Sequence, residues 1–356
     1  MFKLAVLLGY VTSVLAIISG IFLQPILLHN FGDADYILWT NFIIVIGYFS
    51  NGFVGVQTFA TMFISKSKSK LESIQILSDT KKTIVILSGL ILVTLVLLKP
   101  INLHFDFELL SSNVFITCLF FVLFRISNES ALSYYSGIQK PLIPKIYDFI
   151  IKLVSIILIG AICFFQLGLN KAILCFFLFQ AIASIYLLFL KKESNIHSKK
   201  FNSKTFFNVA ALSLPYLAVS IPQSFLQTVD TLILSKYLEP VEVASFIFYM
   251  KIFSIVLISQ NIIMSIYSPR WARLLARNNI KMLNKSFYSI NFILFCILFF
   301  VFLILNFYGS EIMFLWTKRQ DLTLNSNELV LILALIGAYA LRTNYYFLNN
   351  SIGINK

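Results

Sequence analysis

A chain of 356 residues in which 59% are apolar and only 12% are charged is too hydrophobic for a water-soluble globular domain. Its 37 Phe residues indicate that lipid surrounds most of the chain. The net charge of +13 leaves nucleic acid binding open until the positions of the cations are considered.

Ten apolar runs of about 20 residues, the length that crosses a hydrocarbon core of roughly 30 Å, follow one another along the chain. They cover residues 5–29, 37–63, 83–103, 112–137, 145–168, 171–190, 209–236, 242–267, 287–309 and 328–350. The first run is too long for a signal-peptide core and contains Gln24 and Pro25, so we expect it to remain as helix one. Runs such as 114–123 and 292–305 are apolar on every side, whereas membrane-spanning strands alternate every second residue. The expected fold class is therefore all-α, a polytopic transmembrane bundle of about ten spans.

Lys and Arg residues divide unevenly between the two sides of these helices. The side that holds the N-terminus carries 19, and the other side carries five. By the positive-inside rule, both chain ends are expected to be cytoplasmic, in a multi-pass protein of the bacterial cytoplasmic (inner) membrane. Because topology explains the charge, we expect no nucleic acid partner. In residues 270–285, three Arg residues share one helical face, which predicts an amphipathic helix lying on the anionic inner leaflet.

Side chains suited to metal or nucleophilic chemistry do not cluster in the sequence. Four cysteines fall inside predicted spans without a CxxC spacing, and three histidines lie in different loops or helix ends. These residues are Cys118, Cys163, Cys175 and Cys296, and His29, His104 and His197. We therefore expect packing cysteines, no metal, no cofactor and no enzyme active site.

The second part of the chain repeats the first. Each copy opens with a helix bearing Pro and Gln, continues through a short acidic turn and a basic segment, and has one Arg in its fourth helix. The matching residues there are Arg125, Asn128, Gly137 and Lys140 against Arg342, Asn344, Gly353 and Lys356. Parallel halves of this kind are common in secondary transporters. The predicted organisation is a six-helix lobe (1–190), a cytoplasmic linker (191–208) and a C-terminal lobe (209–356), which has four helices and is expected to be truncated.

Two stretches of the chain resemble Wzx-type O-antigen flippases and related polysaccharide exporters. The first reads LLHNFGDADYILWTNFIIVIGYFSNGFVGVQTFATMFIS, with a Gly and Tyr-x-x-Trp turn and a Gly-bearing end to helix two. The second, SLPYLAVSIPQSFLQTVDTLILSKYLEPVEVASFIFYMKIFS, is similar to their seventh and eighth helices and includes Asp230 and Lys251. The resemblance implies the MATE-like fold of the multidrug/oligosaccharidyl-lipid/polysaccharide superfamily, in which two lobes surround a central cavity and work by alternating access.

Charged residues within predicted spans are candidate site residues, because each costs about 2.5 to 3.5 kcal/mol at the bilayer centre. Arg125 has Glu129 one turn on, and two interpretations are open. Either the two residues form a structural pair, or Arg125 belongs to a cationic cavity wall, where its planar guanidinium binds two oxygens of a pyrophosphate. Arg342 occupies the matching place in the second copy and has no acid one turn away.

Four further charged positions, in two pairs, leave two interpretations open. Lys251 and Asp230 form either a structural bridge or part of a cavity, and Asp148 with Lys152 forms either a structural pair or an ion or proton relay. Uncharged polar residues in the spans either join helices or bind sugar hydroxyls. They are Asn41, Asn51, Gln57, Gln180, Gln260, Asn261 and Asn291.

Three functions compete for this pattern. A multidrug exporter of the same fold favours an acidic cavity, whereas the in-span charges here are four cations against three acids. A membrane polymerase or acyltransferase of polysaccharide assembly needs a larger outer loop than residues 310–327. We therefore predict a flippase that moves an undecaprenyl-pyrophosphate-linked O-antigen or capsule unit for lipopolysaccharide or other polysaccharide biosynthesis.

In this prediction the site residues have two roles. The substrate phosphates are expected to bind Arg125, Arg342 and Lys251, and ion or proton coupling is expected to use Glu129, Asp148, Lys152 and Asp230. The expected partners are the lipid-linked oligosaccharide, membrane lipids and other polysaccharide-assembly proteins.

Overall fold

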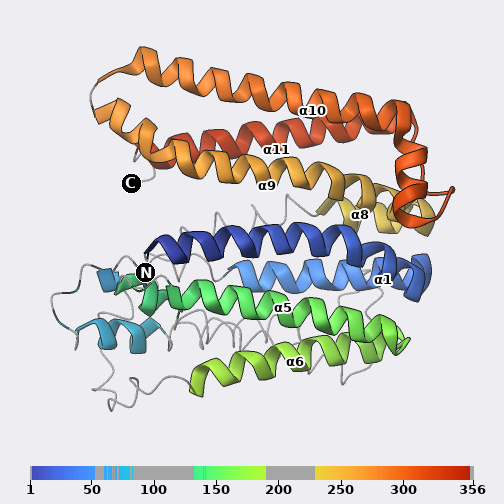
Figure 1. Cartoon of the computed structure of the whole chain (residues 1–356), viewed down its shortest axis with the longest axis horizontal. Coiled ribbons are helices and arrows are strands. Elements are labelled where there is room, and N and C mark those ends of the chain that lie inside the picture. Colours follow the sequence, from blue (N-terminus) through green and yellow to red (C-terminus); the bar gives the residue numbers. More distant parts are fainter. Residues whose placement is uncertain are drawn as a thin grey trace. The chain divides into compact units, whose positions relative to one another are not determined.

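The structure is a computed structural model that describes four stretches of the chain. They are residues 2–52, 60–82 except 62, 66, 68, 70, 71 and 81, 132–189 except 139 and 141, and 229–352 except 277. Within them, the labelled elements are all helices (Figure 1). They are α1 (Phe2–Gly52), α5 (Leu142–Phe164), α6 (Leu169–Phe189), α8 (Val229–Tyr237), α9 (Pro240–Ala276), α10 (Ile280–Thr317) and α11 (Ser326–Ile352).

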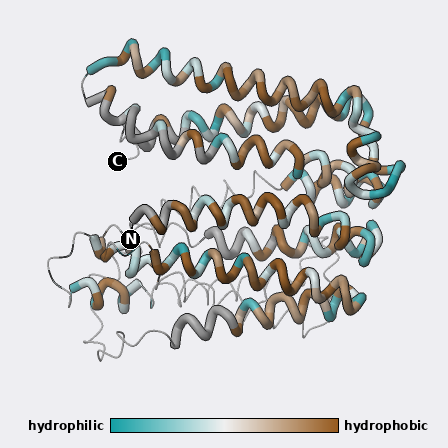
Figure 2. The backbone as a smooth tube through the Cα atoms, viewed as in Figure 1, coloured by the Kyte–Doolittle hydropathy of each residue, from teal (hydrophilic) through white to brown (hydrophobic). Residues whose placement is uncertain are grey.

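Five of the described helices, α1, α5, α9, α10 and α11, are long and apolar enough to cross a membrane. Hydrophobic residues occupy the middle of these helices, and hydrophilic residues gather at their ends and in the connecting turns (Figure 2). Large apolar side chains such as Phe292, Phe295 and Leu331 are exposed, as expected of surfaces that face lipid. The prediction of an all-α transmembrane bundle is confirmed, and the chain is a multi-pass membrane protein.

Contacts divide the chain into an N-terminal unit, Met1–Asp230, and a C-terminal unit, Thr231–Lys356. The expected lobe boundaries stay a prediction, because the linker at 191–208 lies outside the described residues. The predicted spans at 83–103 and over most of 112–137 also lie outside them.

In the N-terminal unit, α1 is a helical hairpin. Gly32 has φ 75° and ψ 175°, a backbone conformation that Gly adopts without a Cβ clash, and the chain reverses there (Figure 1). Across the reversal, the Tyr36 hydroxyl donates a hydrogen bond to Gln24 Oε1 at 2.5 Å. Trp39 packs edge-on against Phe176 of α6, with ring centroids 5.3 Å apart. The Tyr-x-x-Trp pattern therefore closes this hairpin and attaches it to α6.

A short helical stretch at 132–137 packs at very close range against the helical residues around Ile64. Ala60, Ile64, Ile76, Leu77 and Tyr134 form a buried apolar cluster there. A Cβ placed on Gly137 would lie 2.6 Å from Ile64 Cγ2 and 2.7 Å from Ile64 Cβ. Only a residue without a side chain fits this crossing.

Replacing Gly137 with alanine is expected to destabilise the N-terminal unit by about 1–3 kcal/mol, because the added methyl overpacks a rigid, β-branched neighbour. The measurement is thermal unfolding of the purified protein in detergent. Gly160→Ala in α5 is the matched control, since nothing lies within 4 Å of a Cβ there. Equal unfolding temperatures for the two variants would contradict the close crossing.

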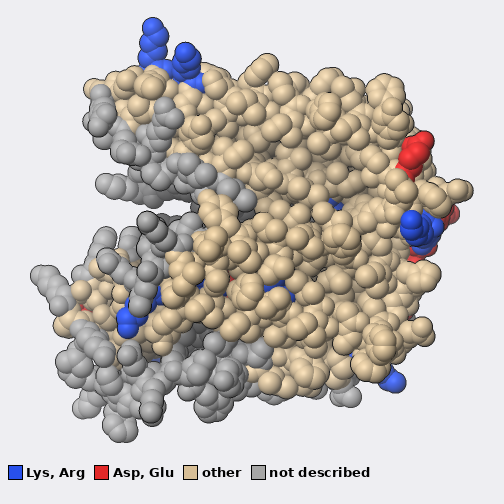
Figure 3. Space-filling view, in the orientation of Figure 1, with Lys and Arg blue, Asp and Glu red and all other residues tan. Residues whose placement is uncertain are grey.

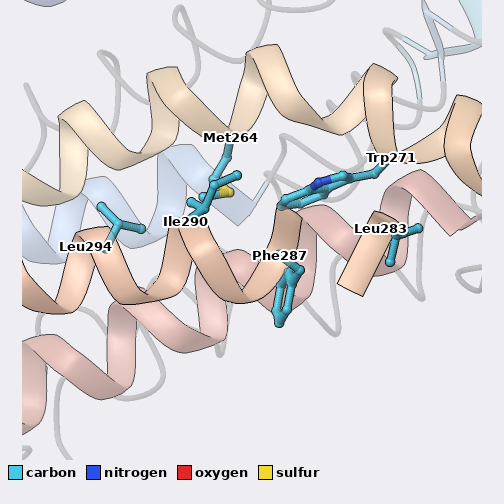
Figure 4. Packing of buried hydrophobic residues seen from close by; sticks show 6 residues of the cluster. All are labelled: Met264, Trp271, Leu283, Phe287, Ile290 and Leu294. Atoms are coloured by element: carbon cyan, nitrogen blue, oxygen red, sulfur yellow. The ribbon is translucent and has the colours of Figure 1, made fainter. Parts of the chain in front are cut away.

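In the C-terminal unit, α9, α10 and α11 each pack against the other two. Trp271 of α9 is fully buried in a cluster that α10 completes (Figure 4). The other members of the cluster are Met264, Leu283, Phe287, Ile290 and Leu294. Asn279 caps α10, its side chain accepting a hydrogen bond from the Met282 N–H at 3.2 Å.

The predicted amphipathic surface helix over 270–285 is wrong. Helix α9 continues to Ala276, and α10 starts at Ile280 after a short turn. The physical reason is that Trp271 and Leu283 lie on the apolar stripes of the two long helices, which bury them in a shared core. Both helices therefore extend beyond the predicted apolar runs.

The turn between α10 and α11 carries an exposed ion pair. Arg319 Nε donates a hydrogen bond to Asp321 Oδ1 at 2.9 Å, and its Nη2 donates to Oδ2. These bonds from Arg319 hold the pKa of the Asp321 carboxyl below its ordinary value. Since a lowered pKa favours the ionised form, the pair persists at neutral pH and weakens only as acid protonates Asp321.

Candidate functional site

Five of the seven predicted site residues lie in described helices. They are Asp148 and Lys152 in α5, Asp230 in α8, Lys251 in α9 and Arg342 in α11. Arg125 and Glu129 lie outside the described residues. On the face drawn in Figure 3, uncharged side chains cover most of the described surface, and most visible charges lie at helix ends. Charges within spans are therefore the exception.

Arg342 lies on the side of α11 opposite its packed face. Buried positions of α11 recur every three or four residues, at Leu329, Ile332, Ile336, Ala340 and Asn344. At roughly 100° per residue, Arg342 lies about 160° around the helix from Asn344. The guanidinium-bearing face, which is partly exposed, therefore points away from α9 and α10.

Lys251 follows a part of α9 that is buried on more than one face. The stripe that packs within the unit includes Phe253, Val256, Gln260 and Met264. Lys251 lies nine residues before Gln260, which is about 180° around the helix. The face that carries Lys251 is itself buried one and two turns earlier, at Ile247 and Ala244. Of the two in-span cations, only Arg342 therefore lies on a face turned away from the packed interior.

In the N-terminal unit, a polar stripe follows one face of α5. The Asp148 carboxylate lies 3.5 Å from Lys145 Nζ, and both side chains are about half exposed. Lys152 lies on the same face, farther along the helix and more deeply buried. Ser155, farther still, accepts a hydrogen bond from Gln180 Nε2 of α6 at 2.9 Å. The ion pair seen for Asp148 is thus with Lys145, and Gln180 joins two helices.

A chain of buried amides links the three long helices of the C-terminal unit. Gln260 Nε2 of α9 donates to both Asn344 Oδ1 and the Ala340 carbonyl of α11, each at 2.6 Å. Asn344 Nδ2 donates to Asn291 Oδ1 of α10 at 2.6 Å, and Asn291 Nδ2 donates to the Phe287 carbonyl at 2.9 Å. The relative exposure of Gln260 is 0% and that of Asn344 is 1%. We name Gln260, Asn344 and Asn291 the amide network.

The sequence singled out each amide without showing that the three meet. Gln260 and Asn291 stood among the polar residues of the spans, and Asn344 was noted only as part of the repeat. The available signal was that all three lie in long apolar helices, where a polar side chain has few partners besides another helix. In the described part of the chain, no three or more His, Cys, Asp or Glu residues gather as a metal site would require.

Comparisons with known proteins agree with this architecture. Residues 215–354 match the MatE family model. An inward-facing multidrug resistance MATE family transporter of the MOP superfamily has a TM-score of 0.62 at 13% identity, over 96% of this chain and 80% of that chain. A MATE in the straight conformation gives 0.60 at 14% identity, over 98% and 81%. No curated protein matches the sequence.

A third solved structure, a MOP superfamily transporter from Pyrococcus furiosus, gives a TM-score of 0.57 at 15% identity, over 98% of this chain and 80% of that chain. Together these similarities show that the chain has the fold of the MATE transporters. The fold implied by the sequence resemblance is therefore confirmed.

Proposed function

We propose that this protein is a transporter that moves an anionic lipid-linked oligosaccharide across the bacterial cytoplasmic membrane by alternating access. The proposed cargo is an undecaprenyl-pyrophosphate-linked O-antigen or capsule unit, delivered to other polysaccharide-assembly proteins. One observation carries the proposal: Arg342 lies inside a candidate membrane span, on a helix face turned away from the packed interior of its unit, and Lys251 is a second cation within a span of that unit.

Placing a cation on such a face needs compensation. A Lys or Arg at the centre of a lipid-facing helix costs about 2.5–3.5 kcal/mol on insertion scales. Contact with a water-filled path or with an anion removes most of that cost. Arg342 suits a pyrophosphate in particular, because the planar guanidinium offers two parallel donors to two phosphate oxygens. Lys152, in α5, supplies a further in-span cation in the N-terminal unit.

The alternative function is export of cationic drugs, which the fold also supports, because two similar structures are named as multidrug resistance transporters. That cargo favours in-span carboxylates. The structure describes two of the predicted in-span carboxylates, Asp148 and Asp230, and Asp148 is already paired with Lys145 at the start of α5. The Pyrococcus furiosus transporter is described as having a binding pocket of reverse polarity that suggests a different function. The polarity of a binding site is thus a reasonable guide to cargo on this fold, and the in-span cations of this chain favour an anion.

A pair of complementation experiments tests the proposal. The full-length gene product is expected to restore surface polysaccharide to a strain that lacks its own lipid-linked oligosaccharide flippase. In a drug-sensitive strain without its own exporters, it is expected to leave the inhibitory concentrations of cationic drugs unchanged. Protein in the membrane is quantified in both strains. Drug resistance without polysaccharide at the surface would overturn the proposal and favour the exporter.

A further inference from the structure

The amide network joins α9, α10 and α11 at one level of the C-terminal unit. Three of its four hydrogen bonds measure 2.6 Å, and the fourth measures 2.9 Å. Gln260 donates twice to α11, and Asn344 of α11 donates once to α10. Helix α11 is therefore held from both of its neighbours at the same turn.

Hydrogen bonds of this kind define how a helix is rotated about its axis. The other buried positions near this part of α11, Ile332, Ile336 and Ala340, are aliphatic and can pack in more than one rotation. In lipid, no hydrophobic force favours one apolar helix face over another. A rotation of α11 by one residue, about 100°, would carry Asn344 away from both partners. Rotated states would then leave buried amides unsatisfied.

The orientation of Gln260 is itself fixed. Its Nε2 faces two oxygen acceptors, Ala340 O and Asn344 Oδ1. Reversing the amide would place Gln260 Oε1 against those same oxygens, which repel it. In the observed orientation, Oε1 is buried and has no hydrogen-bond partner among the described residues. The two donated bonds are therefore what hold the side chain, and Gln260 acts on α11 as a donor.

We infer that the amide network is a positioning device that fixes the rotation of α11 so that Arg342 faces away from the packed interior. Arg342 lies two residues before Asn344, about 160° around the helix, so the bond that holds Asn344 inward holds Arg342 outward. That the rotation of α11 is fixed follows from the hydrogen bonds of the amide network and needs no assumption about transport. The further consequence, that Gln260 sets the position of a substrate-binding guanidinium, rests on the proposed function.

Site-directed spin labelling measures this rotation without any transport assay. In a background in which the four cysteines are replaced, single nitroxide labels are placed in turn at positions 335–343 of the full-length protein in liposomes, which leaves Asn344 in place. Collision with oxygen reports exposure to lipid, and collision with a water-soluble nickel complex reports exposure to water. We expect the lowest summed exposure at positions 336 and 340 and the highest at 338 and 341, whether that face meets water or lipid.

Gln260→Met removes the donor and keeps a side chain of similar length. It is expected to shift the exposure minimum of α11 by at least one residue or to flatten the pattern. Val256→Ala, one turn earlier on the same buried stripe of α9, is the matched control and should leave the pattern unchanged. If Gln260→Met yields no folded protein, Asn291→Leu cuts only the link to α10 and is expected to flatten the pattern partly. An unchanged pattern in the folded variant would overturn the inference.

Polysaccharide export separates this inference from the proposed function. If both hold, Gln260→Met shifts the pattern and raises the substrate concentration needed for half-maximal transport, as Arg342→Gln does. A shifted pattern with unimpaired export would keep the positioning role and remove Arg342 from the substrate site. An unshifted pattern with impaired export would overturn the positioning role.

Discussion

Replacing Trp271 with alanine is expected to lower the free energy of unfolding by about 3–5 kcal/mol, the usual range for removing a large buried aromatic side chain. Trp271 has no exposed surface and packs edge-on against Phe287, with ring centroids 5.7 Å apart. Its Nε1 donates a hydrogen bond to Ser286 Oγ at 3.1 Å. The substitution would open a cavity where α9 and α10 meet and leave the Ser286 hydroxyl without its donor.

Denaturant unfolding of the purified protein in detergent measures this loss. Trp271→Phe keeps an aromatic ring in the cluster and should lose much less than the alanine variant. Ser286→Ala removes only the hydrogen-bond acceptor and is expected to lose roughly 1 kcal/mol. If Trp271→Ala unfolds with the same free energy as Trp271→Phe, the cluster contributes little, and the extension of α9 to Ala276 needs another explanation.

Replacing Arg342 with glutamine is expected to lower the apparent affinity for the lipid-linked substrate while protein abundance stays normal. A charge-assisted hydrogen bond contributes about 1.5–3 kcal/mol, which corresponds to roughly 10- to 100-fold in affinity. Arg342→Lys should recover only part of this loss, because an ammonium cannot make the two-pronged phosphate contact. Lys251→Gln is expected to act in the same direction.

Export normalised to protein in the membrane is the measurement for these variants. Lys285→Gln, which removes one positive charge from an exposed position at the start of α10, is the matched control and should export normally. Normal export by the Arg342→Gln, Lys251→Gln double variant would remove both residues from the substrate site, whatever the fold.

Much of the fold could be predicted because the thickness of the hydrocarbon core sets the length of an apolar run. The run at 145–168 matches α5 within a few residues, and the acidic turn after helix one lies at the reversal of α1. The ends of α9 and α10 were missed. Their outer turns contain charged residues, and only the partner helix shows that Trp271 is buried there.

The candidate site was predicted less completely. Sequence spacing identified Arg342 and Lys251 as in-span cations, and helix periodicity then explains why Arg342 lies opposite a buried stripe. The pairing or relay of Asp148 with Lys152 stays a prediction, and Lys145, on the same face of α5, forms an ion pair with Asp148 that the sequence analysis did not include. The amide network could not be read from the sequence, because the meeting of Gln260 with Asn344 depends on how two distant helices are rotated against each other.

Reconstituted vesicles test the central claim most directly. An undecaprenyl-pyrophosphate-linked oligosaccharide is built on the inner leaflet of liposomes that contain the full-length protein, and a lectin added outside reports the sugar that reaches the outer leaflet. The account predicts lectin binding that rises with time in protein-containing vesicles, is weakened by Arg342→Gln, and is lacking in protein-free vesicles. Lectin binding equal to that of protein-free vesicles, with correctly folded protein present, would contradict it.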